Sequence, residues 1–377
     1  MRRPWLTLLV ALAACTAQQD DAPAPTNNSS GLRYLGGGAD QGFARATAPR
    51  EFRFPADHGG HPEFQTEWWY LTGNLADADG RHFGFELTFF RYAVAPATVP
   101  HETASAWRTD QIWMAHFAIT DTNEQRFITA ERLSRQALGL AGVTPEPLRI
   151  WTEDWSLEGG EAAGRLALRA EAHDEDIDLA LELTATQPPV AHGAAGLSRK
   201  GAAVGNASYY YSVPRLEARG TIGVEAETFT VAGSAWLDRE WSTSSLEPGI
   251  AGWDWFALHI SDGASLMFYR LRTASGESSP YSGGSYVSAA GVRTELSAAD
   301  VALTALGHWT SRTTGTRYPT AWRLRLASQG LELEIRPYLQ QQEIDLSVRY
   351  WEGAVHAEGL GPQGRATAQG YLELAGY

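Results

Sequence analysis

Residues 67–75 read Glu-Trp-Trp-Tyr-Leu-Thr-Gly-Asn-Leu, and after a turn at Asp79-Gly80 residues 84–91 read Gly-Phe-Glu-Leu-Thr-Phe-Phe-Arg. These stretches decide the fold, because aromatic residues favour strands and Asp-Gly is a strong hairpin signal. The arrangement returns as Trp-Asp-Trp-Phe-Ala-Leu-His-Ile over residues 253–260, a turn at Asp262-Gly263, and Leu-Met-Phe-Tyr-Arg over residues 266–270. Both copies are an aromatic strand, a turn and an aromatic strand ending in arginine. This repeat predicts two similar halves.

The remainder of the chain from Glu51 onward is built of short alternating segments. Apolar and charged residues alternate over residues 166–172, 177–183, 322–326 and 331–335. A period of two is typical of antiparallel strands with one wet face. The one stretch that suggests a short helix is 129–139. The pattern therefore predicts an all-β protein made of barrels or sandwiches.

The two halves are expected to meet near residues 213–218, after the Tyr-Tyr-Tyr-Ser-Val-Pro stretch that begins at Tyr209. This gives an N-terminal domain over 49–215 and a C-terminal domain over 216–377. Residues 15–48 are rich in Gln, Asp, Asn, Ser, Pro and Gly and are expected to form a flexible tether.

The first 14 residues resemble a secretory signal, since two arginines precede a short apolar run that ends in small residues. The run is too short for a permanent membrane span. Leu12-Ala13-Ala14-Cys15 resembles the bacterial lipobox, so we expect Cys15 to be lipidated; an ordinary signal peptide with an incidental cysteine is the alternative. The protein is then expected in the bacterial cell envelope, anchored in the outer membrane and facing the periplasm.

Composition excludes several classes of protein. With 14 Trp, 14 Tyr and 13 Phe the chain is too aromatic for a disordered protein, and its net charge of −14 disfavours a nucleic-acid partner. A single cysteine excludes a disulfide framework within one chain. No phosphate loop, dinucleotide fingerprint or Gly-x-Ser-x-Gly motif is present. Lys200 is the only lysine, so nearly all the positive charge is arginine; a GC-rich genome can account for such a bias, and the sequence alone assigns no function to it.

One dense polar segment precedes the first aromatic strand. Asp57, His58, His61, Glu63 and Glu67 fall within eleven positions. Such a cluster suits a metal ion, although the two histidines sit in a Gly-Gly loop rather than on a regular element. The alternative is that Glu67 points inward and is held by an arginine of the paired strand, as a buried carboxylate requires.

A second segment, Ala-Trp-Leu-Asp-Arg-Glu-Trp over residues 235–241, places two acids between tryptophans. On a strand, Asp238 and Glu240 share one face and Arg239 takes the other. Two acids in an aromatic setting can have separated pKa values, which leaves one able to protonate a substrate. The alternative is that an acid pairs with an arginine and closes a barrel end, with Trp236 and Trp241 as plugs.

Isolated residues give weaker signals. His116 and His259 alternate with apolar neighbours and are expected in the core or in a pocket wall rather than as bases. The tyrosines at 209–211 either line a cavity or pack.

Six motifs together resemble the AttH-like branch of the carotenoid 1,2-hydratase (hydroxyneurosporene synthase) superfamily. They are residues 67–75, 235–241, 252–256, 266–272, 350–355 and 370–377. The resemblance implies two tandem lipocalin-like antiparallel β-barrels. It also implies relatives that hydrate a terminal isoprenoid double bond, fungal relatives that bind polyenes and promote cycloadditions, and a frequent association with ABC-transporter permeases. Arg239 stands where the hydratase branch has histidine.

From the resemblance we expect a hydrophobic ligand (lipid, isoprenoid or polyene) in a pocket near the domain junction, with an ABC-transporter permease as a partner. We expect a ligand-binding envelope protein; the alternatives are an isoprenoid hydratase and a non-catalytic transporter scaffold. The catalytic candidates are Asp238, Glu240 and Glu67, with no metal and no cofactor. The ligand-binding candidates are Trp68, Trp69, Tyr70, His116, Tyr210, Trp236, Trp241, Trp253, Trp255 and Tyr269.

Overall fold

The computed structural model describes residues 42–96, 105–244 and 246–377. The expected signal segment over 1–14, Cys15 and most of the expected tether lie outside these residues. No helix within the described ranges has the length and apolar character needed to cross a membrane.

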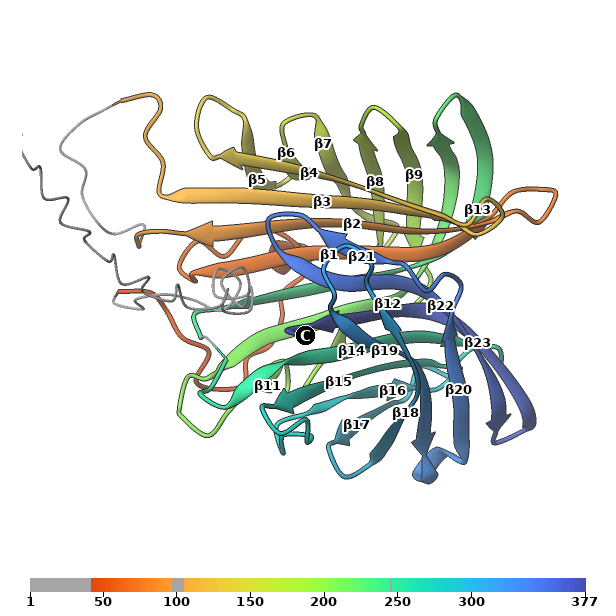
Figure 1. Ribbon diagram of the computed structural model, residues 1–377. Helices are drawn as coiled ribbons and strands as arrows, with labels where there is room; N and C mark the ends of the chain where they lie inside the picture. Colours follow the sequence, from red (N-terminus) through yellow and green to blue (C-terminus); the bar gives the residue numbers. More distant parts are fainter. Residues whose placement is uncertain (1–41, 97–104, 245) are drawn as a thin grey trace, which may run out of the picture.

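The first half of the chain forms one antiparallel sheet that curls into a nearly closed barrel (Figure 1). The strand order is β4-β3-β2-β1-β13-β12-β9-β8-β7-β6-β5, and β10 and β11 pair with β12. These strands are β1 (Thr66–Ala76), β2 (His82–Ala93), β3 (Gln111–Asp121), β4 (Arg126–Arg135), β5 (Ala141–Pro145), β6 (Leu148–Thr152), β7 (Trp155–Ala162), β8 (Arg165–His173), β9 (Ile177–Ala185), β10 (Val190–Ala191), β11 (Leu197–Arg199), β12 (Ala207–Val224) and β13 (Glu227–Ser242). A short 3-10 helix, η1 (Ala56–His58), precedes β1.

The second half forms a separate antiparallel sheet that curves into a half barrel below the first in Figure 1. Its order is β17-β16-β15-β14-β23-β22-β20-β19-β18, with β21 on β22. The elements are β14 (Ile250–Ile260), β15 (Ser265–Thr273), β16 (Gly283–Val287), β17 (Arg293–Ser297), β18 (Val301–Thr310), β19 (Arg317–Leu326), η2 (Ala327–Gln329), β20 (Leu331–Pro337), β21 (Glu343–Asp345), β22 (Arg349–Gly361) and β23 (Gly364–Ala375). The all-β expectation is confirmed.

Each sheet encloses its own hydrophobic core. Inward residues of the first sheet, among them Trp69, Phe117 and Trp155, form one cluster, and Phe256 and Trp322 belong to the cluster of the second. The strands supply these residues because alternate side chains point to the same face. Both interiors are thus occupied by the protein's own side chains.

The sequence repeat corresponds to a cross-strand ion pair that is present in both halves. Glu67 at the start of β1 lies directly opposite Arg91 of β2, and Asp254 near the start of β14 lies opposite Arg270 of β15. Both pairs are ion pairs: Arg91 Nε is 3.1 Å from Glu67 Oε2, and Arg270 Nη2 is 2.5 Å from Asp254 Oδ2. The arginine that ends the second aromatic strand therefore neutralises a buried carboxylate at the beginning of the first.

The change from one sheet to the other comes between Ser242 and Ile250. Judged by sheet membership, this is later than the expected boundary between residues 215 and 216, which lie inside β12. Pro214 lacks an N–H donor and coincides with a bulge between Val213 and Leu216, after which β12 continues to pair with β13. The proline marks an irregularity within β12.

Two other local expectations differ from the structure. The helix expected at 129–139 is wrong, because residues up to Arg135 form β4. This strand lies at the edge of the sheet and pairs only with β3. Apolar residues on the exposed face of β4 produce the spacing that suggested a helix. Residues 42–48, counted in the tether, include Ala46, which is 1% exposed in the first core, and Ala44, whose N–H donates to Glu63 O. The chain is thus packed on the barrel before residue 49.

The two halves pack outer face to outer face. Between the sheets lies a third cluster that includes Tyr70, Tyr210, Trp255 and Tyr371. Gly84 of β2 is needed here, because a Cβ at this position would lie 2.5 Å from Ala354 Cβ of β22. This seam between the sheets, rather than either barrel interior, holds the polar and aromatic residues discussed next.

Candidate functional site

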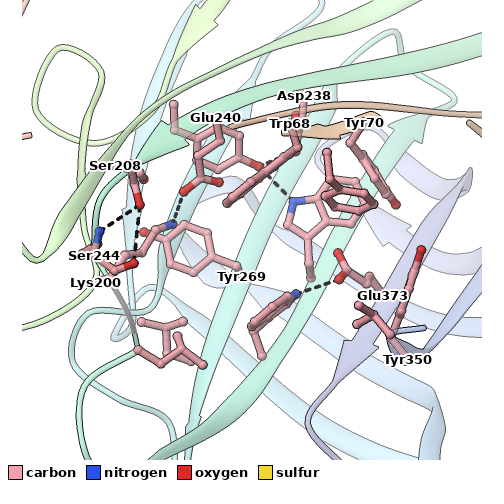
Figure 2. A pocket seen from close by; sticks show the side chains of 18 residues that line it. Trp68, Tyr70, Lys200, Ser208, Asp238, Glu240, Ser244, Tyr269, Tyr350 and Glu373 are labelled. Atoms are coloured by element: carbon pink, nitrogen blue, oxygen red, sulfur yellow. Dashed lines mark hydrogen bonds and ion pairs between the residues drawn. The ribbon is translucent and has the colours of Figure 1, made fainter. Parts of the chain in front are cut away.

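A cavity of about 130 Å³ opens in the seam (Figure 2). Its walls come from both halves, and eight of the 18 lining residues are aromatic. The lining residues are Trp68, Tyr70, Phe90, Lys200, Ser208, Tyr210, Asp238, Glu240, Ser242, Ser244, Leu246, Trp253, Trp255, Tyr269, Leu271, Val348, Tyr350 and Glu373. Such a site, concave and aromatic with a few polar groups, has the character of a small-molecule pocket.

Equivalent strands of the two halves contribute equivalent pairs to the cavity. Trp68 of β1 lies opposite Glu240 of β13, and Trp255 of β14 lies opposite Glu373 of β23. The cavity is therefore bounded by two copies of one Trp–Glu cross-strand pair, and each sheet presents its outer face to it.

Among the acids that line the cavity, Asp238 accepts the most hydrogen bonds. Its carboxyl group accepts hydrogen bonds from Tyr210 Oη, Ser212 Oγ and Trp236 Nε1, the last at 2.6 Å. Burial raises the pKa of Asp238 to about 7, although these three donors oppose the rise. A carboxyl group with this pKa is partly protonated at neutral pH and can act as a general acid.

A second neutral acid comes from the other half. Burial raises the pKa of Glu373 to about 8, even though Trp253 Nε1 donates to Glu373 Oε1 at 3.0 Å. Behind it, burial also raises the pKa of Glu352, whose Oε1 accepts a hydrogen bond from Tyr70 Oη at 2.6 Å. This end of the cavity holds uncharged carboxylic acids rather than carboxylates.

The opposite end of the cavity carries a charged pair (Figure 2). Lys200 Nζ is 3.2 Å from Glu240 Oε1 and lies 3.8 Å from the ring centre of Tyr269. Burial alone would lower the pKa of Lys200, but the Glu240 carboxylate raises it, so the side chain is an ammonium ion. The two glutamates of the paired Trp–Glu motif thus have different surroundings, because only Glu240 has a cation beside it.

A line of hydrogen-bonding groups leads away from Asp238. Ser212 Oγ contacts Asp238 and is 2.6 Å from His192 Nε2, while His192 Nδ1 is 3.0 Å from Ser285 Oγ. Burial lowers the pKa of His192 well below its usual value, so the ring is neutral. Neutral imidazole both accepts and donates, and these contacts can pass a proton from Ser212 toward β16.

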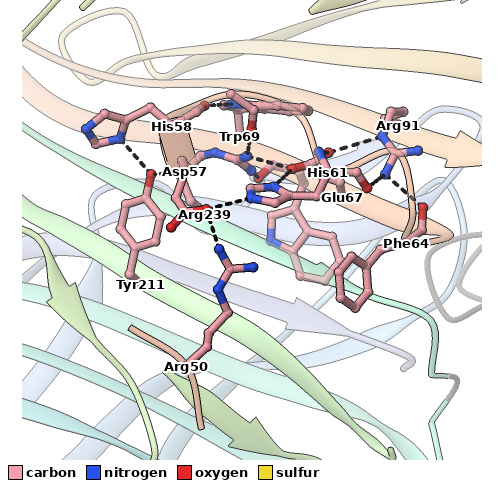
Figure 3. A network of polar contacts seen from close by, with 12 residues as sticks. Arg50, Asp57, His58, His61, Phe64, Glu67, Trp69, Arg91, Tyr211 and Arg239 are labelled. Carbon is pink, nitrogen blue, oxygen red and sulfur yellow. Dashed lines mark hydrogen bonds and ion pairs between the residues drawn. The ribbon is translucent and has the colours of Figure 1, made fainter. Parts of the chain in front are cut away.

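The other face of β13 belongs to a separate network inside the first barrel (Figure 3). Glu67 is bound by Arg239 at 2.7 Å, by Arg91, and by His61 Nδ1 at 2.7 Å. Burial would raise the pKa of Glu67, but Arg239 and its neighbours hold it well below the usual range. The interpretation of Glu67 as an inward carboxylate held by the paired strand's arginine is confirmed.

The same network accounts for the polar loop before β1. His61 Nε2 is 3.0 Å from Asp57 Oδ1, and the His61 ring stacks on Trp241 at 3.7 Å. Arg50 Nη2 lies 2.6 Å from Asp57. Within the described ranges no three His, Cys, Asp or Glu side chains are grouped as metal ligands. The contacts tie the segment before β1 to the barrel end.

The candidate residues from the sequence therefore separate into three groups. Eight line the cavity: Asp238, Glu240, Trp68, Tyr70, Tyr210, Trp253, Trp255 and Tyr269. Glu67, Trp69 and Trp241 face the first barrel's interior. Trp236 and His116 lie behind the wall, where Trp236 holds Asp238 and His116 Nδ1 is 2.7 Å from Tyr350 Oη.

Sequence reasoning missed Lys200, His192 and Glu373. Lys200 and His192 follow the very short strands β11 and β10, which have no periodic signal. Glu373 stands in the last aromatic motif but carried no chemical signature of its own. One signal was available for Lys200, since a single lysine in an arginine-rich chain is conspicuous.

The geometry defines a class of protein in which two antiparallel barrel-like sheets pack together and enclose a cavity in the seam between them. The family model described as AttH-like matches residues 45–377, and the chain belongs to the AttH-like family. It is similar to a solved Nitrosomonas europaea structure designated AttH, at 32% identity and a TM-score of 0.77, covering 89% of this chain and 100% of that one. The fold is also that of kievitone hydratase from Nectria haematococca, at 14% identity and a TM-score of 0.67, covering 91% and 98%. No curated protein matches the sequence.

Proposed function

We propose that the protein is a cofactor-independent hydratase that adds water to a carbon–carbon double bond of an apolar ligand held in the seam cavity. The observation that carries this proposal is Asp238, a buried acid with a pKa of about 7 in an aromatic cavity. The structural similarity to a hydratase supports it as an analogy of fold.

The first step is proton transfer from the Asp238 carboxyl group to one alkene carbon, which leaves a carbocation on the neighbouring carbon and a carboxylate on Asp238. The faces of Trp68, Trp253 and Trp255 are suited to stabilise that cation by cation–π attraction. Because the walls exclude most water, the carboxylate left on Asp238 also attracts the cation strongly.

The second step is attack of one water molecule on the cation, with loss of one proton to give the alcohol. Glu373 is protonated at neutral pH and cannot accept this proton. The proton returns to the Asp238 carboxylate, which lines the cavity. The cycle consumes one alkene and one water and restores the acid.

The test begins with native mass spectrometry and solvent extraction of protein purified from its own membranes, which identifies any retained isoprenoid or lipid. That compound, or a panel of prenylated and terpenoid alkenes, is then incubated in water enriched in oxygen-18. We expect a labelled alcohol from the native protein and a loss of turnover of about 10²-fold or more in Asp238→Asn. As a matched control, Asp178→Asn changes an exposed acid and keeps activity. Unchanged turnover in Asp238→Asn would exclude the mechanism.

Ligand binding without turnover is the second candidate. It is favoured by the three donors on Asp238, which satisfy the carboxyl group in the absence of any substrate. In that case a hydrophobic molecule is retained and extracted, but no alkene of the panel gains water with native protein.

We also propose that the protein is a lipoprotein of the bacterial outer membrane facing the periplasm, anchored through Cys15, and that it works beside an ABC-transporter permease. Its support is the N-terminal sequence and the family resemblance. Mass spectrometry of the mature N-terminus and the Cys15→Ser variant test the anchor. Co-purification of a permease tests the partner, and a permease bound equally well by a variant with a blocked cavity favours the scaffold function.

A further inference from the structure

Lys200 is the only lysine of the chain, and its side chain is buried in the cavity wall, 16% exposed. Everywhere else this sequence uses arginine for positive charge. The two residues are not equivalent, since lysine offers a compact ammonium with three donors and arginine a large planar fork. At the cavity wall, Lys200 therefore presents a compact ammonium group where an arginine would present a planar fork.

The contacts of Lys200 leave part of its donor capacity for a ligand. Lys200 Nζ is paired with Glu240 Oε1 at 3.2 Å and lies over the Tyr269 ring, 3.8 Å from the ring centre. A lysine ammonium has three N–H donors, and these two contacts do not use all three. On Glu240, the described residues place no donor within hydrogen-bond distance of Oε2, and the side chain lines the cavity.

From this geometry we infer that the ligand carries a hydroxyl group, phenolic or alcoholic, that accepts a hydrogen bond from Lys200 and donates one to Glu240. The inference rests on the proposed seam cavity and defines its ligand class as an oxygenated unsaturated molecule rather than a pure hydrocarbon. Figure 2 places Lys200 and Glu373 at opposite ends of the cavity, so the hydroxyl group is held away from the neutral acids.

Other ligand groups fit this end less well. A carboxylate would meet the Glu240 carboxylate, which already neutralises Lys200. A carbonyl group would satisfy Lys200 but leave Glu240 Oε2 without a donor. A hydrocarbon would leave the remaining N–H of Lys200 and the Oε2 atom of Glu240 without partners, and unsatisfied buried groups weaken binding. Covalent attachment is disfavoured because an ammonium ion is not a nucleophile.

The test compares three probes with one skeleton: 4-prenylphenol, its methyl ether 4-prenylanisole, and prenylbenzene. Affinities are measured by calorimetry with native protein, Lys200→Met and Lys200→Arg. With native protein we expect the phenol to bind at least about 10-fold more tightly than prenylbenzene, with the ether between them. In Lys200→Met the three affinities should converge within about threefold, and Lys200→Arg should not restore the preference. Glu240→Gln should reduce it.

Equal affinity of native protein for the phenol and prenylbenzene, or an undiminished preference in folded Lys200→Met, would overturn the inference. Because the native comparison needs no variant, misfolding of Lys200→Met does not remove the test. The measurement is independent of turnover, and Asp238→Asn should keep the preference for the phenol. If native protein prefers the phenol but hydrates no alkene, only the hydratase proposal is refuted. If it hydrates an alkene but binds the phenol and prenylbenzene equally, only the hydroxyl proposal is refuted.

Discussion

Asp238 and Arg239 are consecutive residues of β13 whose side chains enter different compartments. The Asp238 carboxyl group reaches the seam cavity, where Trp236 Nε1 donates to it at 2.6 Å. Arg239 Nη2 lies 2.7 Å from Glu67 Oε1 inside the first barrel. The strand therefore separates an acid suited to proton transfer from an ion pair suited to stabilising the fold.

The pH dependence of activity follows from the pKa of Asp238, which burial raises to about 7. The acid must be protonated before each turnover, so kcat/KM should be level below pH 7 and fall about tenfold per pH unit well above it. Steady-state rates from pH 5 to pH 9 check this. An activity that increases with pH would mean that Asp238 acts as a base.

Stability should also decrease as the solution becomes alkaline. Burial raises the pKa of Glu373 to about 8 and that of Asp238 to about 7, so the folded state binds more protons than the unfolded state between about pH 4 and pH 8. This contribution is complete below about pH 4. It decreases by about 1.4 kcal/mol per pH unit for each group that is ionised in the unfolded state but still protonated in the folded state, and it is lost once the pH has risen through 7 to 8.

Thermal unfolding at pH 6 and pH 9 measures this effect. Between pH 6 and pH 9 the Tm of native protein should fall further than the Tm of Glu373→Gln, because the glutamine cannot ionise. An equal loss in both proteins would show that Glu373 is already ionised at pH 6.

The Glu67 network should be essential for stability but not for ligand recognition. Arg239→Met leaves the buried Glu67 carboxylate with less compensating charge, and breaking a buried pair costs about 3–5 kcal/mol. Urea unfolding should show this loss, and the double variant Glu67→Gln/Arg239→Met should recover part of it. Where Arg239→Met remains folded, its affinity for a cavity ligand should stay within about twofold of native. A large loss of affinity at unchanged stability would place Arg239 in the site.

The seam should be sensitive to a single methyl group. In Gly84→Ala the new Cβ would lie 2.5 Å from Ala354 Cβ, so the two sheets must separate locally. We expect a lower Tm and weaker ligand binding, with a cost of about 1–3 kcal/mol. The compensating double variant Gly84→Ala/Ala354→Gly removes the opposing methyl and should recover most of both. Failure of Ala354→Gly to compensate would mean that another contact, such as Tyr371 Oη at 2.9 Å, sets the spacing.

Much of the fold could be predicted because period-two alternation and Asp-Gly turns are local signals. The same alternation predicted that Asp238 and Glu240 share a face, as the cavity lining has them. It could not decide which face of β1 meets the second half, so Trp69 was grouped with Trp68 and Tyr70. Nor could it show that the strand containing Pro214 continues past a bulge to Val224.

The partners of the two acids could not be predicted from spacing. His192 and Lys200 lie in loops and reach the seam only because β10 and β11 fold onto β12. Glu373 comes from the last strand and meets Trp253 through the β14–β23 pairing, more than a hundred residues away in sequence. Such contacts depend on the packing of one sheet against another, for which the chain carries no local pattern.

The paired Trp–Glu motifs on either side of the cavity bear on how such a site can arise. Two identical subunits meeting at a twofold axis would have to carry the same residues in both copies, and their two glutamates would share one environment. Joining the copies in a single gene removes that constraint. In the first half Lys200 stands beside Glu240, whereas in the second half Glu373 is uncharged beside Trp253. The cavity therefore has one end with an ion pair and one end with a neutral acid, an asymmetry that two identical subunits could not provide.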